Sequence, residues 1–178
     1  MGEAPMVKRE EWLVVDGYNV IGADPEVKWH PASLEEERVK LIRDLSEYQA
    51  MTGRQVHLVF DAHLKPGAGV KTNQEKVFVY YTRRDETADE FIESFVKKNK
   101  SPHRAIYVAT SDYLEQRMVF GQGAYRISSR ELLEEIRVAK KNLSEKLRKE
   151  EENQVRNTLE DRLSRELRQM LDKWRRKK

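Results

Sequence analysis

Four aspartates in this sequence stand at positions where carboxylates of one site are expected to meet. Asp16, Asp61 and Asp112 each follow an apolar run that is typical of a buried strand. Asp89 lies in the first turn of a predicted helix. Because side chains at the carboxyl ends of parallel strands gather at one edge of an open sheet, we expect the four acids to share one site.

Such a cluster needs a cation. Two unit charges about 4 Å apart repel by roughly 4 kcal/mol at an effective dielectric near 20, and a divalent ion removes that repulsion. Oxygen ligands favour Mg²⁺ or Mn²⁺, which bind substrate phosphates readily. A site of this kind activates water and stabilises the charge that develops on a phosphodiester under attack.

Each aspartate also has a structural explanation. Asp16 suits the turn that Asp16-Gly17 predicts, Asp89 favours the positive end of a helix, and Asp112 suits a helix cap. Asp61, together with His63, suits the organisation of the loop after its strand. The metal site is therefore the hypothesis that accounts for all four acids jointly.

The elements that must position these acids alternate along the chain. Five apolar runs predict strands at Glu11–Val15, Gln55–Phe60, Val77–Tyr81, Arg104–Ala109 and Tyr125–Ile127. Helices are predicted from Ser33 to Gly53, from Thr87 through Val96, and at about 113–120. This alternation predicts an α/β fold with a mainly parallel, helix-covered sheet.

Local signals mark several boundaries. Ser33 with Glu36, and Thr87 with Glu90, have the spacing of a capping box at a helix start. The segment 65–73, which contains a proline and two glycines, predicts an exposed loop.

The C-terminal part is predicted to be helical from Ser128 onward, with a bend or break at Glu150–Asn153. We divide the chain into an α/β domain at 10–135 and a basic helical extension at 136–178. The apolar stripe of the extension predicts packing on the domain or into a helical hairpin. Residues 1–136 carry 19 basic and 23 acidic groups, whereas residues 137–178 carry 15 and 8. This asymmetry indicates a polyanionic partner for the extension.

Composition excludes other chemistry and suggests the compartment. The sequence has no cysteine, which excludes thiolate metal ligands and thiol catalysis. Its first residues lack the apolar core of a signal peptide, and no apolar run approaches the roughly 18 residues of a membrane span. We therefore expect a cytoplasmic protein without a membrane partner.

Four short motifs occur in an order that is typical of one family. They are Asp16-Gly17-Tyr18-Asn19, Phe60-Asp61-Ala62-His63, Thr87-Ala88-Asp89-Glu90 and Thr110-Ser111-Asp112-Tyr113. Together they resemble the YacP-like branch of the NYN family, over about 12–133 and more loosely into the helical extension. The resemblance implies a PIN-like three-layer fold with a nuclease domain, followed here by the C-terminal helical extension.

The same resemblance implies a metal-dependent endoribonuclease that cuts mRNA in association with the ribosome. Asp16, Asp89 and Asp112 match the acidic positions of the family, as catalytic residues and as ligands of Mg²⁺ or Mn²⁺. Asn19 matches a polar companion that orients water or a phosphate, although an asparagine in a turn explains it equally well. Asp61 is a further metal ligand in this hypothesis. The expected reaction is in-line attack of a metal-activated water, which leaves a 5′-phosphate and a 3′-hydroxyl.

Basic residues in two regions are candidates for RNA binding. They are Lys71, Lys76, Arg83 and Arg84 in the domain, and Arg175 and Arg176 at the end of the extension. The alternative is an ordinary solvated surface. Tyr80 and Tyr81 lie between the basic residues, but they point to opposite faces of a strand, so at least one is expected in the core.

Two rival functions differ from the nuclease hypothesis. A phosphatase that resembles the haloacid dehalogenases needs a second aspartate two residues after the first. This sequence has Tyr18 at that position, which argues against a phosphatase of this kind. A noncatalytic RNA-binding or ribosome-binding adaptor with a PIN-like fold remains the alternative, because it needs the fold but not the geometry of the acids.

Overall fold

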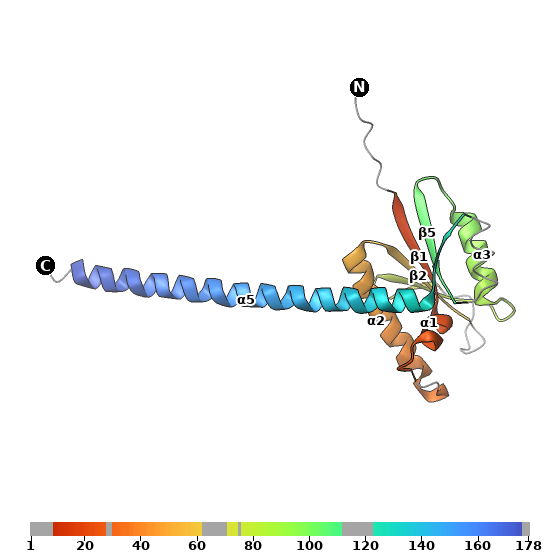
Figure 1. Ribbon diagram of the computed structural model, residues 1–178, viewed down its shortest axis with the longest axis horizontal. Helices are drawn as coiled ribbons and strands as arrows, with labels where there is room; N and C mark the ends of the chain where they lie inside the picture. Colours follow the sequence, from red (N-terminus) through yellow and green to blue (C-terminus); the bar gives the residue numbers. More distant parts are fainter. Residues whose placement is uncertain (1–8, 28–29, 62–70, 75, 112–122, 176–178) are drawn as a thin grey trace, which may run out of the picture. The chain divides into compact units, whose positions relative to one another are not determined.

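The computed structural model describes residues 9–27, 30–61, 71–74, 76–111 and 123–175. The chain divides into two compact units, 1–140 and 141–178, and each is described by itself. The elements of the first unit (Figure 1) are β1 (Glu10–Asp16), α1 (Gly17–Ala23), η1 (Pro31–Ser33), α2 (Leu34–Thr52), β2 (Gln55–Phe60), β3 (Lys71–Gln74), β4 (Val77–Tyr81), α3 (Ala88–Asn99), β5 (Arg104–Ala109), β6 (Tyr125–Ile127) and the start of α5 (Ser129–Arg175).

Six strands form one sheet in the order β3-β4-β2-β1-β5-β6. All neighbouring pairs are parallel except β3 with β4. In β1, Asp16 pairs with Val59 of β2, and Val15 pairs with Ala109 of β5. The carboxyl ends of these three inner strands therefore lie at the same edge of the sheet, as the sequence predicts.

The inner strands consist of β-branched and aliphatic residues because helices cover both of their faces. Leu13, Val14 and Val15 are fully buried in succession, and so are Leu58 and Val59. Continuous burial of this kind is typical of a parallel sheet between two helical layers.

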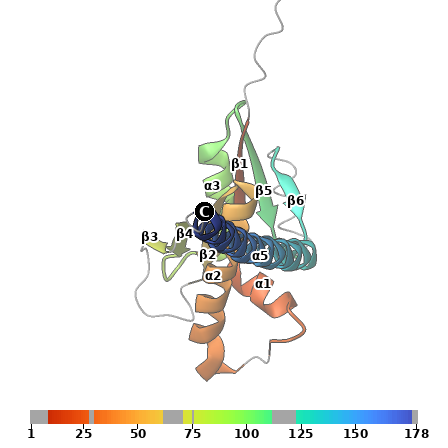
Figure 2. The same ribbon diagram turned by 90° about the vertical axis from the view of Figure 1, so that its left-hand side faces the viewer.

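Two hydrophobic cores define the layers. One contains the side chains of α1, α2 and the first turns of α5, including Val20, Leu45 and Leu132, and the other contains Ile92 and Val96 of α3. Helices α2 and α3 accordingly lie on opposite sides of the sheet (Figure 1), and Figure 2 views the sheet from the α2 side. The three-layer α/β fold with a mainly parallel sheet is thus confirmed.

Of the two predicted capping boxes, one is confirmed and one is wrong. The Thr87 hydroxyl accepts from the Glu90 N–H at 3.2 Å, and the Glu90 carboxylate accepts from the Thr87 N–H at 3.0 Å. Ser33 instead donates its hydroxyl to the carbonyl oxygen of His30, at 3.0 Å. The 3-10 turn η1 precedes α2 and holds Ser33 in a helical backbone conformation, where its side chain does not cap α2.

Three further predictions differ from the structure. A seven-residue helix, α1, follows Asp16 directly where a turn was expected. The end of the predicted loop 65–73 belongs to β3, which pairs with the edge of β4. Helix α5 runs through Glu150–Asn153 without the expected break, because glutamate is a good helix former and the sequence from Ser129 to Arg175 has no glycine or proline. The predicted helix at about 113–120 lies outside the described residues.

The course of helix α5 tests two parts of the prediction for the C-terminal extension, namely where it begins and whether it forms a hairpin. Ile136 and Ala139, which we assigned to the extension, are buried in the core of the first unit. In the second unit the helix is continuous, so the hairpin alternative is wrong. Apolar side chains of the second unit are exposed, namely Leu147, Val155, Leu163, Leu167, Met170, Leu171 and Trp174.

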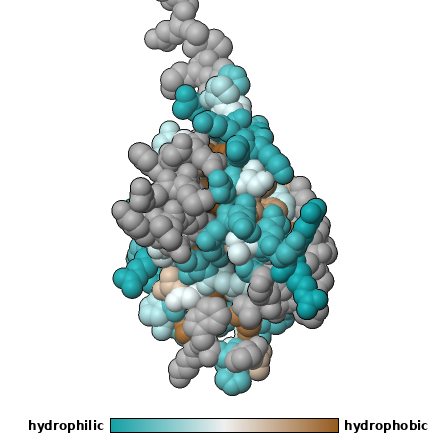
Figure 3. All heavy atoms as spheres, turned by 90° about the vertical axis from the view of Figure 1, so that its right-hand side faces the viewer, coloured by the Kyte–Doolittle hydropathy of each residue, from teal (hydrophilic) through white to brown (hydrophobic). Residues whose placement is uncertain are grey.

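The described surface in Figure 3 is mostly hydrophilic, and apolar residues show there only in small separate areas. Within the described part of the chain, no helix has the length and apolarity needed to cross a membrane.

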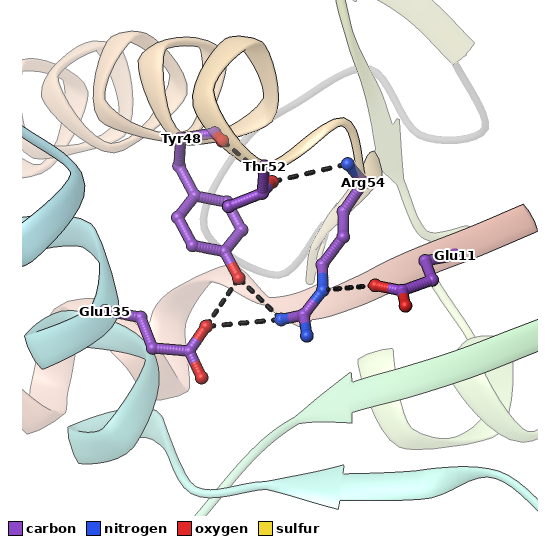
Figure 4. A network of polar contacts seen from close by, with 5 residues as sticks. All are labelled: Glu11, Tyr48, Thr52, Arg54 and Glu135. Atoms are coloured by element: carbon purple, nitrogen blue, oxygen red, sulfur yellow. Dashed lines mark hydrogen bonds and ion pairs between the residues drawn. The ribbon is translucent and has the colours of Figure 1, made fainter. Parts of the chain in front are cut away.

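A polar network joins four elements of the first unit (Figure 4). Arg54, just before β2, donates to the Tyr48 hydroxyl of α2 at 2.7 Å, to Glu135 of α5 at 3.2 Å, and to Glu11 of β1 at 2.8 Å. The Tyr48 hydroxyl donates to Glu135 at 2.5 Å. The guanidinium also lies 4.6 Å from the centre of the Tyr107 ring. This network fixes α2 and the start of α5 against the amino ends of β1 and β2.

We expect Arg54→Ala to lower the free energy of unfolding by about 1–2 kcal/mol, because it leaves Glu11 and Glu135 without their cation. The value stays moderate because both carboxylates are partly exposed and therefore screened. Urea denaturation of the purified protein measures it. The control is Arg148→Ala, whose exposed pair with Glu152 contributes at most about 0.5 kcal/mol. Equal losses for the two variants would show that the network does not stabilise the fold.

Candidate active site at the carboxyl edge of the sheet

Asp16 ends β1 and caps α1. The residue is 9% exposed, and its carboxylate accepts from the Asn19 N–H at 3.2 Å. The chain turns from strand to helix at Gly17, where an added Cβ would clash with the Phe60 ring. Only glycine fits there, so the packing of Gly17 on β2 fixes the position of the Asp16 carboxylate.

Burial and the charges around Asp16 oppose its ionisation. The pKa of Asp16 is raised to about 6: burial is the largest cause, the Asn19 N–H counteracts it, and the carboxylates of Asp89 and Asp61 add to the rise. Asp61 follows β2 and is half-buried, whereas Asp89 is exposed in the first turn of α3. The structure therefore brings three of the four predicted acids to the same edge, and their roles in catalysis remain predictions.

Asp112 lies outside the described residues. Among the residues that are described, no three histidine, aspartate or glutamate side chains form a group that could hold a metal ion. Mg²⁺ keeps several waters and needs only one or two protein carboxylates together with substrate phosphates. Asp16, a buried carboxylate whose negative neighbours raise its pKa, fits such an ion by its chemistry.

Asn19 has a different environment from the one expected. Its side-chain oxygen accepts from the Ser111 N–H at 2.8 Å and from the Ser129 hydroxyl at 2.6 Å. Asn19 thus ties α1 to the end of β5 and to the start of α5. The oxygen is engaged inside the protein, so the described contacts make Asn19 a positioning residue for this edge. Whether its amide nitrogen also orients water or a phosphate stays a prediction.

Sequence reasoning missed two residues at this edge. Ser129 is fully buried and holds Asn19, but a serine at a helix start has many ordinary explanations. Arg38 of α2 is also buried; it donates to the Tyr18 hydroxyl at 2.9 Å and pairs with Glu35. Burial raises the pKa of Tyr18, so this hydroxyl stays protonated at neutral pH.

The predicted RNA-binding residues are dispersed. Arg83 and Arg84 are exposed between β4 and α3, near the start of the helix that carries Asp89. Lys76 is exposed in a left-handed turn, and Lys71 lies in the edge strand β3.

The rest of that prediction concerns the extension and the tyrosines. Arg175 is exposed and is the last residue of α5, and Arg176 lies outside the described residues. Tyr80 is buried, with its hydroxyl 3.0 Å from Nδ1 of the buried His57, and Tyr81 packs on Phe60. The expectation that at least one tyrosine lies in the core is therefore confirmed.

A parallel sheet between two helical layers, with acids at the carboxyl edge of the sheet, defines a PIN-like α/β domain. The model of the YacP-like NYN domain matches residues 13–176, and the chain belongs to this family. The match includes all of α5, so the long helix is part of the family pattern.

Individual relatives agree with this assignment. The chain is 44% identical over 165 residues to the uncharacterized protein YacP of Bacillus subtilis (strain 168), covering 92% of this chain and 96% of that protein. The crystal structure of Rae1 (YacP) from Bacillus subtilis is similar with a TM-score of 0.73 and 42% identity, over 93% of this chain and 94% of that one. A crystal structure of a mutant of Rae1 gives a TM-score of 0.68 and 43% identity, over 79% of this chain and 82% of that one.

We expect Asp16→Asn to stabilise the protein at neutral pH when divalent ions are absent. The pKa of Asp16 in the folded protein lies above its ordinary value of 3.8, so ionisation favours the unfolded chain. The resulting loss of stability develops between pH 4 and about pH 6 and is complete above that range. Its size is about 3 kcal/mol, and the variant avoids it.

Urea denaturation in EDTA at pH 4 and pH 7.5 measures this effect. The gain from Asp16→Asn should appear at pH 7.5 and shrink toward pH 4, whereas Asp172→Asn on the exposed part of α5 should show no such gain. If the Asp16→Asn variant is less stable than the intact protein at pH 7.5, the ionised Asp16 carboxylate does not destabilise the folded protein as we expect.

Proposed function

We propose that this protein is a metal-dependent endoribonuclease that hydrolyses mRNA in association with the ribosome. The observation that carries the proposal is the buried Asp16 carboxylate, with Asp89 and Asp61 close enough to raise its pKa. Natural proteins keep such a destabilising arrangement where function requires it. Membership of the NYN family and the order of the four motifs support the same conclusion.

In this proposal Asp16 and Asp89 hold Mg²⁺ or Mn²⁺, and Asp61 and Asp112 complete its surroundings. The ion, when bound, supplies Lewis-acid chemistry to the scissile phosphodiester and to water. Asp16 is fixed by the Asn19 N–H, and Asn19 is fixed in turn by Ser111 and Ser129. These contacts hold the carboxylate in one orientation before substrate arrives, which reduces the entropy lost in reaching the transition state.

No side-chain nucleophile is needed for this reaction. In-line attack by water breaks the bond between phosphorus and the 3′ oxygen, and the products carry a 5′-phosphate and a 3′-hydroxyl. A ribonuclease that uses the 2′-hydroxyl as nucleophile leaves 2′,3′-cyclic phosphate instead. The chemistry of the product ends therefore separates the two reaction classes.

The association with RNA and the ribosome is supported by charge. Residues 137–178 carry a net charge of +7, whereas residues 1–136 carry −4. The described basic side chains of the second unit are exposed, including those of Arg148, Arg162 and Arg175. A basic helix attracts phosphates, and this attraction weakens steeply as salt rises.

We expect Asp89→Asn to lower the rate of RNA cleavage by on the order of 100-fold or more, because it removes a carboxylate from the ion. The measurement maps RNA ends in a translating bacterial extract with Mg²⁺, in parallel with the same RNA left untranslated. Asp85→Asn is the matched control: it makes the same change four residues earlier, and Asp85 is not among the charges that raise the pKa of Asp16.

Each outcome of this experiment is informative. Cleavage of only the translated RNA, with 5′-phosphate ends, supports the whole proposal. Equal activity of the Asp89→Asn and Asp85→Asn proteins, or cyclic phosphate ends, would exclude the metal mechanism. RNA or ribosome binding without cleavage by the intact protein would favour the noncatalytic adaptor.

A further inference from the structure

A pocket of about 580 Å³ opens beside the carboxylate edge. Its lining comes from α1, the end of β5, β6 and the start of α5, with the residues Tyr18, Asn19, Gly22, Ala23, Ser111, Arg126, Ser128 and Arg130. Its volume is in the range of sites that hold a small ligand. All of the lining residues belong to the first unit.

The pocket adjoins the candidate active site through Asn19. This residue lines the pocket, its N–H donates to Asp16 at 3.2 Å, and its side-chain oxygen accepts from Ser111, which also lines the pocket. A chain of RNA that places one phosphate at Asp16 therefore has its neighbouring nucleotide within reach of this pocket.

The described lining of the pocket carries positive charge. Arg126 and Arg130 are exposed, and none of the lining residues that the structure describes is acidic. Glu131 is the neighbouring carboxylate, and it accepts from the Ser128 N–H at 2.7 Å while the Ser128 hydroxyl accepts from the Glu131 N–H at 3.2 Å. Hydrogen bonds from Ser128, and less strongly the charge of Arg126, lower the pKa of Glu131.

The remaining lining residues suit a phosphate as well. Guanidinium groups bind phosphate oxygens with paired N–H donors, and the serine hydroxyls of the pocket are further donors. Gly22 and Ala23 are small, which leaves room for a ribose beside the charged groups. The combination of two arginines, hydroxyl groups and small residues fits a phosphodiester better than a free base.

We propose that Arg126 and Arg130 bind a phosphodiester of the RNA strand next to the one that is cut. This inference deepens the proposed function and rests on it for the position of the cut. In this proposal, residues of β6 and of the start of α5 bind the RNA substrate. None of the basic residues predicted from the sequence is among the described residues that line this pocket.

The test measures binding of a single-stranded RNA of eight nucleotides by fluorescence anisotropy, in EDTA so that no cleavage occurs. We expect the double variant Arg126→Gln/Arg130→Gln to bind on the order of tenfold or more weakly at low salt. The plot of log affinity against log salt should become shallower by about 0.7, because the two side chains share one phosphodiester and each phosphate contact on a single strand contributes about 0.7 to the slope. Both side chains are exposed, so the variant should keep the melting temperature of the intact protein.

The matched control is Arg43→Gln/Lys97→Gln, which removes two positive charges from exposed positions on α2 and α3. It should bind RNA nearly as well as the intact protein. Equal weakening of the two double variants, unchanged binding by the pocket variant, or no binding by the intact protein at low salt would each overturn the proposal.

Because the assay contains no divalent ion, its result is independent of cleavage. If the pocket variant loses RNA binding and the Asp89→Asn variant still cleaves normally, the result supports the phosphodiester site in the pocket and contradicts the metal mechanism. If Asp89→Asn abolishes cleavage while the pocket variant binds RNA normally, the result supports the metal mechanism and overturns the proposal that the pocket binds a phosphodiester.

Discussion

The burial of the Asp16 carboxylate, close to other acids at the carboxyl edge of the sheet, is the constraint around which this domain is arranged. Asp16 is buried at the end of an inner strand, and the charges of Asp89 and Asp61 lie near enough to raise its pKa. The parallel sheet creates this situation because its inner strands end at one edge. A chain selected for stability alone would place a neutral residue at this position.

Other contacts keep this edge in place despite its repulsion. Gly17 allows the chain to pass against Phe60, and Asn19 joins α1 to β5 and α5 through two short hydrogen bonds. At the amino ends of β1 and β2, Arg54 joins Tyr48, Glu11 and Glu135 in a network where each negative group faces a cation. The two edges thus differ in their electrostatics: the carboxylates of this network are paired with a cation of the protein, and the carboxyl edge is suited to a bound cation.

The sequence predicts the elements whose patterns are strong. The inner parallel strands contain apolar runs, and the start of α3 is a capping box that forms as expected. The shared edge of Asp16, Asp61 and Asp89 followed from the alternation of strands and helices, which fixes where strand ends meet. These features depend on local patterns and on general rules of topology.

The features that sequence reasoning missed depend on tertiary contacts. Helix α1 is short and contains two glycines, so its stability comes from the Asp16 cap and from the packing of Val20 and Ile21. Strand β3 has no apolar alternation and is recognisable only by its pairing with β4. The contact of Ser129 with Asn19 spans 110 positions, and no local pattern reports it.

Binding of Mn²⁺ to the intact protein, followed by electron paramagnetic resonance, tests most directly whether the carboxylate edge is a metal site. We expect Mn²⁺ binding that weakens by more than about tenfold in Asp16→Asn and is unchanged in Asp172→Asn. Equal Mn²⁺ binding by the intact protein and the Asp16→Asn variant, or no binding by the intact protein, would contradict the claim that these aspartates hold a divalent cation.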